Sequence, residues 1–95
     1  MAKTSAWDAA EYLDSPEGIA AYLEGALADG DPQLFAAALG DVARAIGMTE
    51  LSRQTGLSRE SLYRSLSADG NPELATVVKV LAAFGVQLSA RPVPV

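Results

Sequence analysis

The stretch LSRQTGLSRESLYRSL, residues 51–66, predicts the central structural unit of this chain. Four of its residues have the spacing of two short amphipathic helices that pack across a tight turn: Leu51, Leu57, Leu62 and Leu66. Gly56 lies at the turn, where glycine adopts a positive φ angle at little cost. Ser52 and Thr55 are small enough to let the two helices approach. The pattern predicts a helix-turn-helix at about residues 49–67.

Signals on both sides of this unit predict further helices. Three helix starts share a capping residue, a proline and then a polar side chain, and they are Ser15-Pro16-Glu17, Asp31-Pro32-Gln33 and Asn71-Pro72-Glu73. Thr49 and Ser58 are expected to cap the two short helices of the unit. Together these signals predict five helices, at about residues 16–28, 32–46, 49–55, 59–67 and 73–84.

The long helices are expected to bury one face each, because their apolar residues recur at helical spacing. For the first helix the expected buried residues are Ile19, Tyr22, Leu23, Ala26 and Leu27. For the second they are Leu34, Phe35, Ala38, Leu39, Val42 and Ile46, and for the fifth they are Leu74, Val77, Val78, Leu81 and Phe84.

After Gly85 the sequence pattern changes from helical spacing to an alternation of apolar and polar residues. Residues 86–91 alternate apolar and polar side chains, which is typical of a half-buried strand, and Pro92 and Pro94 stop it. A single strand needs a neighbour, from another chain or from an extended N-terminal segment at residues 1–14. The sequence thus predicts a mostly α domain at residues 15–95, with five helices and a short C-terminal β-strand.

Composition excludes several classes of function. The 95 residues make one domain and are 49% hydrophobic, which permits a core without disulfides. The chain has no cysteine and no histidine, so thiol chemistry and the usual zinc sites are excluded, and we expect no cofactor and no metal. No apolar run approaches the roughly 20 residues that span a bilayer. We therefore expect a cytoplasmic protein without a membrane partner.

The charge of the chain is unevenly distributed. Residues 1–41 hold eight acids and one base, a net charge of −7, whereas residues 42–95 hold six bases and four acids, a net charge of +2. Four of the seven bases lie close together in the sequence, and they are Arg44, Arg53, Arg59 and Arg64. This division indicates two surfaces with different partners. The alternative is a solvated acidic face with arginines scattered by chance.

The start of the second helix of the unit carries the residues best suited to read DNA. Its first turn is the part that enters the major groove, and Arg59 there opposes the helix dipole. Arg59 is therefore best explained as a residue that contacts guanine or phosphate, and the alternative is an ordinary surface charge. Ser61 either reaches the DNA or is an ordinary helix residue, and Arg64 either contacts the groove or pairs with Glu60. Arg53 is expected near the DNA backbone, and for Tyr63 we favour a packing role.

Two long stretches of the chain resemble known protein families. The stretch TELSRQTGLSRESLYRSLSADGNPELATVVKVLAAFGVQL resembles the Xre-type, lambda-repressor-like helix-turn-helix of HigA-like antitoxins. The preceding stretch, AAEYLDSPEGIAAYLEGALADGDPQLFAAALGDVARAIGM, is similar to the addiction-module antidote proteins. The sharpest motifs are YLDSPE, AAYLEGAL and the DGNP turn, and the resemblance covers about residues 8–91.

The resemblance implies two partners and a set of DNA contacts. Such antitoxins neutralise a small basic RelE/HigB-like ribonuclease toxin encoded beside them, and they bind their own operator and repress it. By position, the residues that would contact DNA are Thr49, Ser58, Arg59, Ser61 and Arg64. Glutamine is frequent in the wider class where this chain has Arg59, so the preferred base is open. A homodimer that reads two half-sites is expected.

Three other readings compete with this one. The first is a stand-alone prophage-type repressor without a toxin, which the neighbouring reading frame would reveal. The second is an enzyme, for which the acids at positions 8, 11, 14 and 17 are the best candidates, and a solvated helix face explains them better. The third is a purely structural helical module. The helix-turn-helix, the split charge and the family resemblance together favour the antitoxin.

Overall fold

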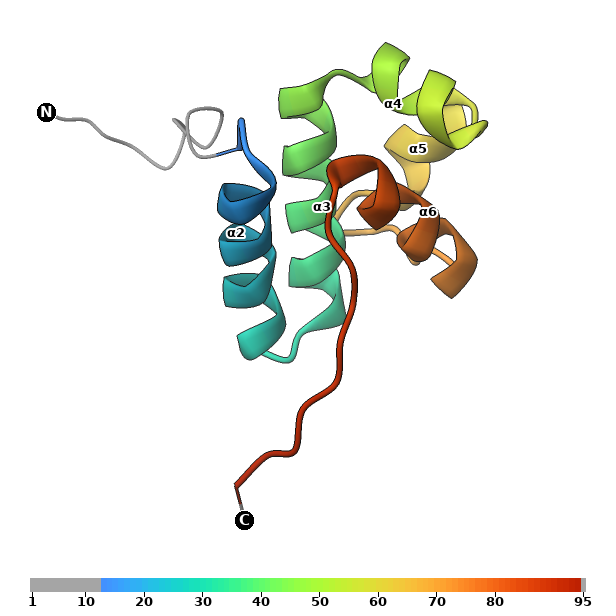
Figure 1. Ribbon diagram of the computed structural model, residues 1–95. Helices are drawn as coiled ribbons and strands as arrows, with labels where there is room; N and C mark the ends of the chain where they lie inside the picture. Colours follow the sequence, from blue (N-terminus) through green and yellow to red (C-terminus); the bar gives the residue numbers. More distant parts are fainter. Residues whose placement is uncertain (1–12, 95) are drawn as a thin grey trace, which may run out of the picture.

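The computed structural model describes residues 13–94 and contains five helices in that part of the chain (Figure 1). They are α2 (Pro16–Ala28), α3 (Pro32–Ile46), α4 (Met48–Thr55), α5 (Arg59–Ser65) and α6 (Leu74–Phe84). α2 and α3 form an antiparallel hairpin, α4 and α5 contact α3 on its other side, and α6 packs on α4 (Figure 1). The mostly helical prediction is confirmed.

The first two helices begin as the sequence predicts. The Ser15 hydroxyl accepts a hydrogen bond from the Gly18 amide at 3.1 Å, and the Asp31 carboxylate accepts one from the Gln33 amide at 2.9 Å. Each cap satisfies a backbone donor that the helix itself leaves without a partner. The proline that follows each cap has no amide hydrogen to lose there. The bounds of α2 and α3 agree with those predicted.

The start of α4 differs from the prediction. Gly47, rather than Thr49, is the cap: its amide bonds the Ala43 carbonyl at 2.8 Å, and its own carbonyl accepts the Leu51 amide at 3.0 Å. One residue therefore ends α3 and begins α4. Thr49 falls inside the first turn of α4 and is exposed.

The bounds of α5 and α6 also differ from the prediction. α6 begins at Leu74, with Glu73 at the cap position and no capping side chain, so Asn71 and Pro72 belong to the preceding loop. α5 ends at Ser65, two residues early, because Leu66 leaves the helical conformation with ψ of +62°. Capping signals in the sequence placed these ends only to within a few residues.

The core lies between the helical hairpin and the helix-turn-helix. Its least exposed large side chains come from α3, α4, α5 and α6 and from Leu66, which directly follows α5; they are Leu39, Val42, Leu51, Leu62, Leu66 and Val80. The prediction was wrong for four apolar residues that are exposed: Leu27, Leu34, Leu74 and Val78. It also missed Val80, which is fully buried. Helical spacing gives the direction of an apolar face, but only the packing of the neighbours decides how wide the covered face is.

The predicted C-terminal strand is absent from the described residues, 13–94. Residues 86–91 pass alongside α2, where Arg91 lies 3.6 Å from Glu24, and the segment then extends beyond the helices (Figure 1); it has no strand partner within residues 13–94. Val86 packs against the core, whereas Leu88 is 42% exposed. Of the alternating apolar residues, Val86 is the one that packs against the core. The alternation alone does not make a strand, because a strand forms only when a second strand pairs with it through backbone hydrogen bonds.

The predicted extended N-terminal segment, residues 1–14, lies mostly outside the described residues, which begin at Leu13. Leu13 itself is buried against the core. Among residues 13–94, no helix is both long enough and apolar enough to cross a membrane.

The turn between α4 and α5 is built on Gly56, as predicted. Its φ of +77° is left-handed, and its amide bonds the Ser52 carbonyl at 2.9 Å. Gly56→Val is expected to lower the free energy of unfolding by about 1–3 kcal/mol, because a β-branched residue resists positive φ. Chemical denaturation measures this loss.

Gly56→Asn is the matched control for this prediction, since asparagine tolerates the left-handed region. Nothing lies within 4 Å of a Cβ added at Gly56, so the strain is conformational and not steric. Equal losses for valine and asparagine would contradict this explanation.

Candidate nucleic-acid interface

The turn of the helix-turn-helix is fixed by side-chain hydrogen bonds. The Ser52 hydroxyl donates to the Leu57 carbonyl at 2.5 Å. The Thr55 hydroxyl donates to the Leu51 carbonyl at 2.8 Å and accepts from the Leu57 amide at 3.2 Å. The sequence suggested only that these two residues are small. Their hydroxyls also satisfy the backbone of the turn, which holds α5 at a defined angle to α4.

The start of α5 is ordered by Ser58. Its hydroxyl accepts a hydrogen bond from the Ser61 amide at 3.0 Å, so Ser58 caps the helix as predicted. Ser61 lies half-buried in the first turn, and its carbonyl accepts from the Ser65 hydroxyl at 2.8 Å. Ser58 itself is exposed.

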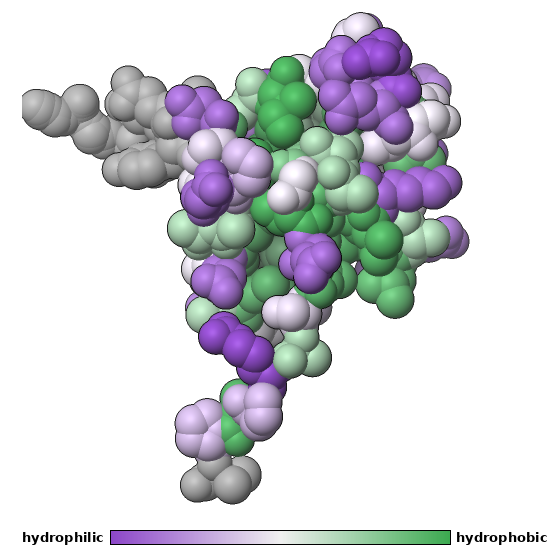
Figure 2. Space-filling view, in the orientation of Figure 1, coloured by the Kyte–Doolittle hydropathy of each residue, from purple (hydrophilic) through white to green (hydrophobic). Residues whose placement is uncertain are grey.

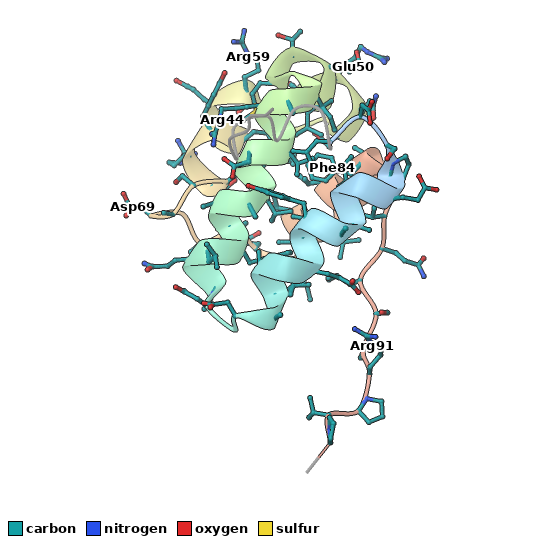
Figure 3. The ribbon with its side chains drawn as sticks, turned by 90° about the vertical axis from the view of Figure 1, so that its left-hand side faces the viewer. Arg44, Glu50, Arg59, Asp69, Phe84 and Arg91 are labelled. Carbon is teal, nitrogen blue, oxygen red and sulfur yellow. The ribbon has the colours of Figure 1, made fainter. Side chains whose placement is uncertain are left out.

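Arg59 and Arg64 are the two arginines of the unit that remain available for a ligand. Both are exposed on α5, and no carboxylate within residues 13–94 forms a salt bridge with either of them. The alternative pairing of Arg64 with Glu60 is therefore not formed. Figure 3 shows Arg59 pointing outward at the end of the molecule where α4 and α5 meet. A guanidinium without a partner has all its donors open to phosphate or to a base edge.

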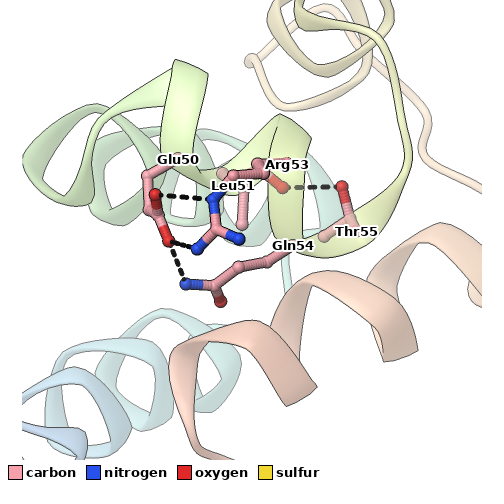
Figure 4. A network of polar contacts seen from close by, with 5 residues as sticks. All are labelled: Glu50, Leu51, Arg53, Gln54 and Thr55. Carbon is pink, nitrogen blue, oxygen red and sulfur yellow. Dashed lines mark hydrogen bonds and ion pairs between the residues drawn. The ribbon is translucent and has the colours of Figure 1, made fainter.

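Arg53 is held within its own helix. Its guanidinium donates two hydrogen bonds to the Glu50 carboxylate, and the Gln54 amide donates a third at 2.7 Å (Figure 4). The bonds from Arg53 and Gln54 lower the pKa of Glu50 to about 2, and Glu50 raises the pKa of Arg53. Arg53 remains exposed but must leave Glu50 to bind a phosphate.

A second carboxylate, Asp41, holds Arg44 in the same way. The Arg44 guanidinium donates to Asp41 at 2.9 Å, and the Tyr22 hydroxyl donates to the other oxygen of Asp41 at 2.6 Å. Burial, together with the hydrogen bond to Asp41, raises the pKa of Tyr22 to about 12. This cluster ties α2 to α3. Two of the four clustered arginines, Arg44 and Arg53, are therefore neutralised by acids of their own helices.

The acids Glu50 and Asp41 are site residues that the sequence analysis missed. Each precedes its arginine by three residues, the spacing at which side chains on one helix face meet, and this signal could have identified them. Tyr63 is 47% exposed, so the packing role favoured for it is not supported. Tyr63 and Arg64 follow one another on the outer side of α5.

The arrangement suits the binding of a ligand. It presents one short helix with small hydroxyls and two guanidiniums that form no salt bridge within residues 13–94, on a turn fixed by hydrogen bonds. Among residues 13–94, no three acidic, histidine or cysteine side chains gather where they could hold a metal ion. The site can therefore offer hydrogen-bond donors and positive charge to an anionic or base-bearing ligand.

Residues 3–92 match the model of a protein family that is described as "Probable addiction module antidote protein". The chain belongs to this family. The matched range contains the acidic helical hairpin as well as the whole helix-turn-helix. Membership in this antidote family therefore rests on both halves of the molecule.

A relative supports the same assignment. An uncharacterized protein of Haemophilus influenzae is 45% identical over 85 residues, which cover 90% of this chain and 88% of the relative. No solved structure matches the chain. The antidote family is thus established by sequence over nearly the full chain.

Proposed function

We propose that this protein is the DNA-binding antitoxin of a toxin–antitoxin module, which neutralises a small basic RelE/HigB-like ribonuclease toxin and represses its own operon. The observation that carries the DNA-binding part is the pair of exposed arginines on α5, Arg59 and Arg64, without a salt bridge to any carboxylate in residues 13–94. Thr49, Ser58 and Ser61 lie on the same helix pair and would add contacts to phosphate or base edges.

The toxin-binding part rests on the charge of the α2–α3 hairpin. From Leu13 to Ile46 the chain carries six acids and one base. The single base, Arg44, is already paired with Asp41. This surface complements a basic toxin, and complementary potentials speed the encounter of two proteins.

The deciding experiment is a binding titration against the DNA upstream of the gene, beside a scrambled duplex, at two salt concentrations. Preference for the upstream DNA that persists at higher salt supports a sequence-reading repressor, because the nonspecific contribution falls steeply with salt. Equal or absent binding on both duplexes overturns the repressor proposal. Co-purification with the product of the adjacent reading frame tests the toxin separately.

The alternative function is a stand-alone repressor of prophage type. It predicts specific operator binding but no co-purifying small basic partner. The family's description as an antidote favours a toxin partner.

Arg59→Ala is expected to weaken binding to the cognate operator by about 1–3 kcal/mol, or about 5- to 150-fold, and to relax the preference at one base pair. The reason is the loss of a two-donor contact to a base edge. A titration against operators substituted at each position measures both effects.

The matched control for this prediction is Arg91→Ala, which removes the same charge. Arg91 lies on the C-terminal segment, away from α5, and pairs with Glu24 at 3.6 Å. The control is expected to bind nearly as the wild type does. An equal loss for Arg59→Ala on operator and random DNA would make Arg59 a phosphate contact.

Glu50→Gln is expected to strengthen binding to any DNA. Removing the carboxylate releases Arg53 for a phosphate, so the dependence of the binding constant on salt becomes steeper by about one phosphate contact. Glu60→Gln is the matched control, since it removes the same charge from the unit without releasing an arginine. Identical gains for the two variants would show that net charge alone is responsible.

A further inference from the structure

The C-terminal segment that follows α6 is extended, and its backbone is left open (Figure 1). The Val86 amide donates to the Leu81 carbonyl at 3.0 Å, but residues 87–94 form no backbone hydrogen bond within the described part of the chain. The two prolines near its end have no amide hydrogen to donate. In Figure 2 the end of the segment projects beyond the body of the molecule. Residues 87–91 therefore form an open edge to which another strand can add.

This open edge is held beside α2 by a contact near each end. At its start Val86 packs against the core. At its end the Arg91 guanidinium lies 3.6 Å from the Glu24 carboxylate of α2, in an exposed and therefore weak ion pair. A segment that is already extended loses less conformational freedom when a second strand pairs with it. The open edge is thus partly prepared for binding.

A groove runs between the open edge and α2. Its volume is about 660 Å³, and its walls include Glu24, Leu27 and Ala28 of α2 and Leu88 of the segment. Leu27 is 46% exposed and Leu88 is 42% exposed, so the groove presents apolar side chains to solvent. A strand that pairs with the open edge would direct every second side chain to the side of this groove, which is how added strands are selected.

The charges beside the groove favour a basic partner over a second copy of this chain. α2 and its C-cap carry Glu17, Glu24 and Asp29, and the last turn of α2 has no base, so the negative end of its helix dipole adds to these acids. Two copies that paired through the open edge would bring two such acidic helices together, and these would repel. A strand that carries lysine or arginine is attracted instead.

We propose that the open edge, residues 87–91, binds an extended strand of the basic toxin through backbone hydrogen bonds, with an apolar side chain of that strand over Leu27 and Leu88 and a basic one beside Glu24. The identity of the partner rests on the proposed function, whereas the mode of binding rests on the groove and the open backbone. Figure 3 shows Arg91 and Arg59 at opposite ends of the molecule. The toxin and DNA are therefore expected to bind different parts of the chain.

The test measures the affinity of the full chain for the purified product of the adjacent reading frame by calorimetry. Amides of neighbouring residues in a strand point to opposite sides, so those of Ser89 and Ala90 cannot both bond the added strand. Of the variants Ser89→Pro and Ala90→Pro, we expect one to weaken binding about 5- to 150-fold, because it leaves a backbone carbonyl of the partner without a donor. The other should bind within about threefold of the wild type, since proline is tolerated where the amide faces solvent.

Ser89→Ala is the matched control, because it removes the hydroxyl but keeps the backbone amide. It should bind as the wild type does. Both positions are exposed, so each variant should melt as the wild type does. Equal losses for the two proline variants, or a loss for neither, overturns the proposal.

Hydrogen exchange of the same complex gives a second measurement. One alternate set of amides, either residues 87, 89 and 91 or residues 88 and 90, should exchange at least about tenfold more slowly in the complex than in the free chain. Protection in the free chain that rises with protein concentration would identify a second copy as the occupant and would overturn the proposal.

The two proposals fail in distinguishable ways. If no complex forms with the product of the adjacent reading frame, the toxin part of the proposed function fails, and the strand contact fails with it. A complex that forms equally well with both proline variants supports the antitoxin function and overturns the strand contact alone.

Discussion

Leu62→Ala is expected to lower the free energy of unfolding by about 2–5 kcal/mol, the usual loss for a large buried aliphatic residue. Leu62 has 0% exposure in the middle of α5, and it shares the core with Leu39, Leu51 and Leu66. The truncation removes apolar contacts and leaves a cavity between α5 and the rest of the core. A loss of this size is a large part of the roughly 5–15 kcal/mol that stabilises a small domain.

Denaturation with urea measures the loss, and thermal melting should show a fall of about 4–8 °C for each kcal/mol. Leu88→Ala is the control, since Leu88 is largely outside the core and should change stability by less than about 0.5 kcal/mol. Comparable losses at the two positions would contradict the assignment of Leu62 to the core.

Gly40→Ala is expected to destabilise the protein by about 3 kcal/mol or more, the upper end of the range for overpacking. A Cβ at this position would lie 2.1 Å from the Leu66 carbonyl oxygen and 3.2 Å from its carbon. Both are backbone atoms at the end of α5, so no side chain can rotate away. The substitution must separate α3 from α5, and with it displace the helix that carries Arg59.

Gly25→Ala is the matched control and should have the opposite sign. Gly25 lies inside α2 with nothing within 4 Å of an added Cβ. Alanine there should stabilise the protein by about 0.5–1 kcal/mol, because glycine is the poorer helix former. Chemical denaturation of both variants is the measurement. Stabilisation by Gly40→Ala would show that α3 and α5 are not in close contact.

The sequence determined the order and type of the helices. Pro16 and Pro32 after capping side chains fixed the starts of α2 and α3, and Gly56 fixed the turn of the helix-turn-helix. These signals are local, since each depends on backbone geometry and hydrogen bonds within a few residues. For the same reason Arg59 could be placed in the first turn of α5 from the sequence.

The tertiary structure decided which charges are available and which apolar residues are covered. Four clustered arginines look alike in the sequence, but Asp41 and Glu50 neutralise Arg44 and Arg53. The exposure of Leu74 and Val78 could not be read from helical spacing, because it depends on which neighbours reach that side of α6.

The same distinction explains Gly40 and the C-terminal segment. Gly40 is an ordinary helix residue by sequence, and its need for glycine arises from the approach of Leu66, 26 positions later in the chain. The alternation at residues 86–91 suggested a strand, but no partner strand is present in residues 13–94. The preference of a segment for a helix or a turn depends on residues that are neighbours in the sequence. The burial of a helix face and the pairing of a strand depend on distant segments that only the fold brings together.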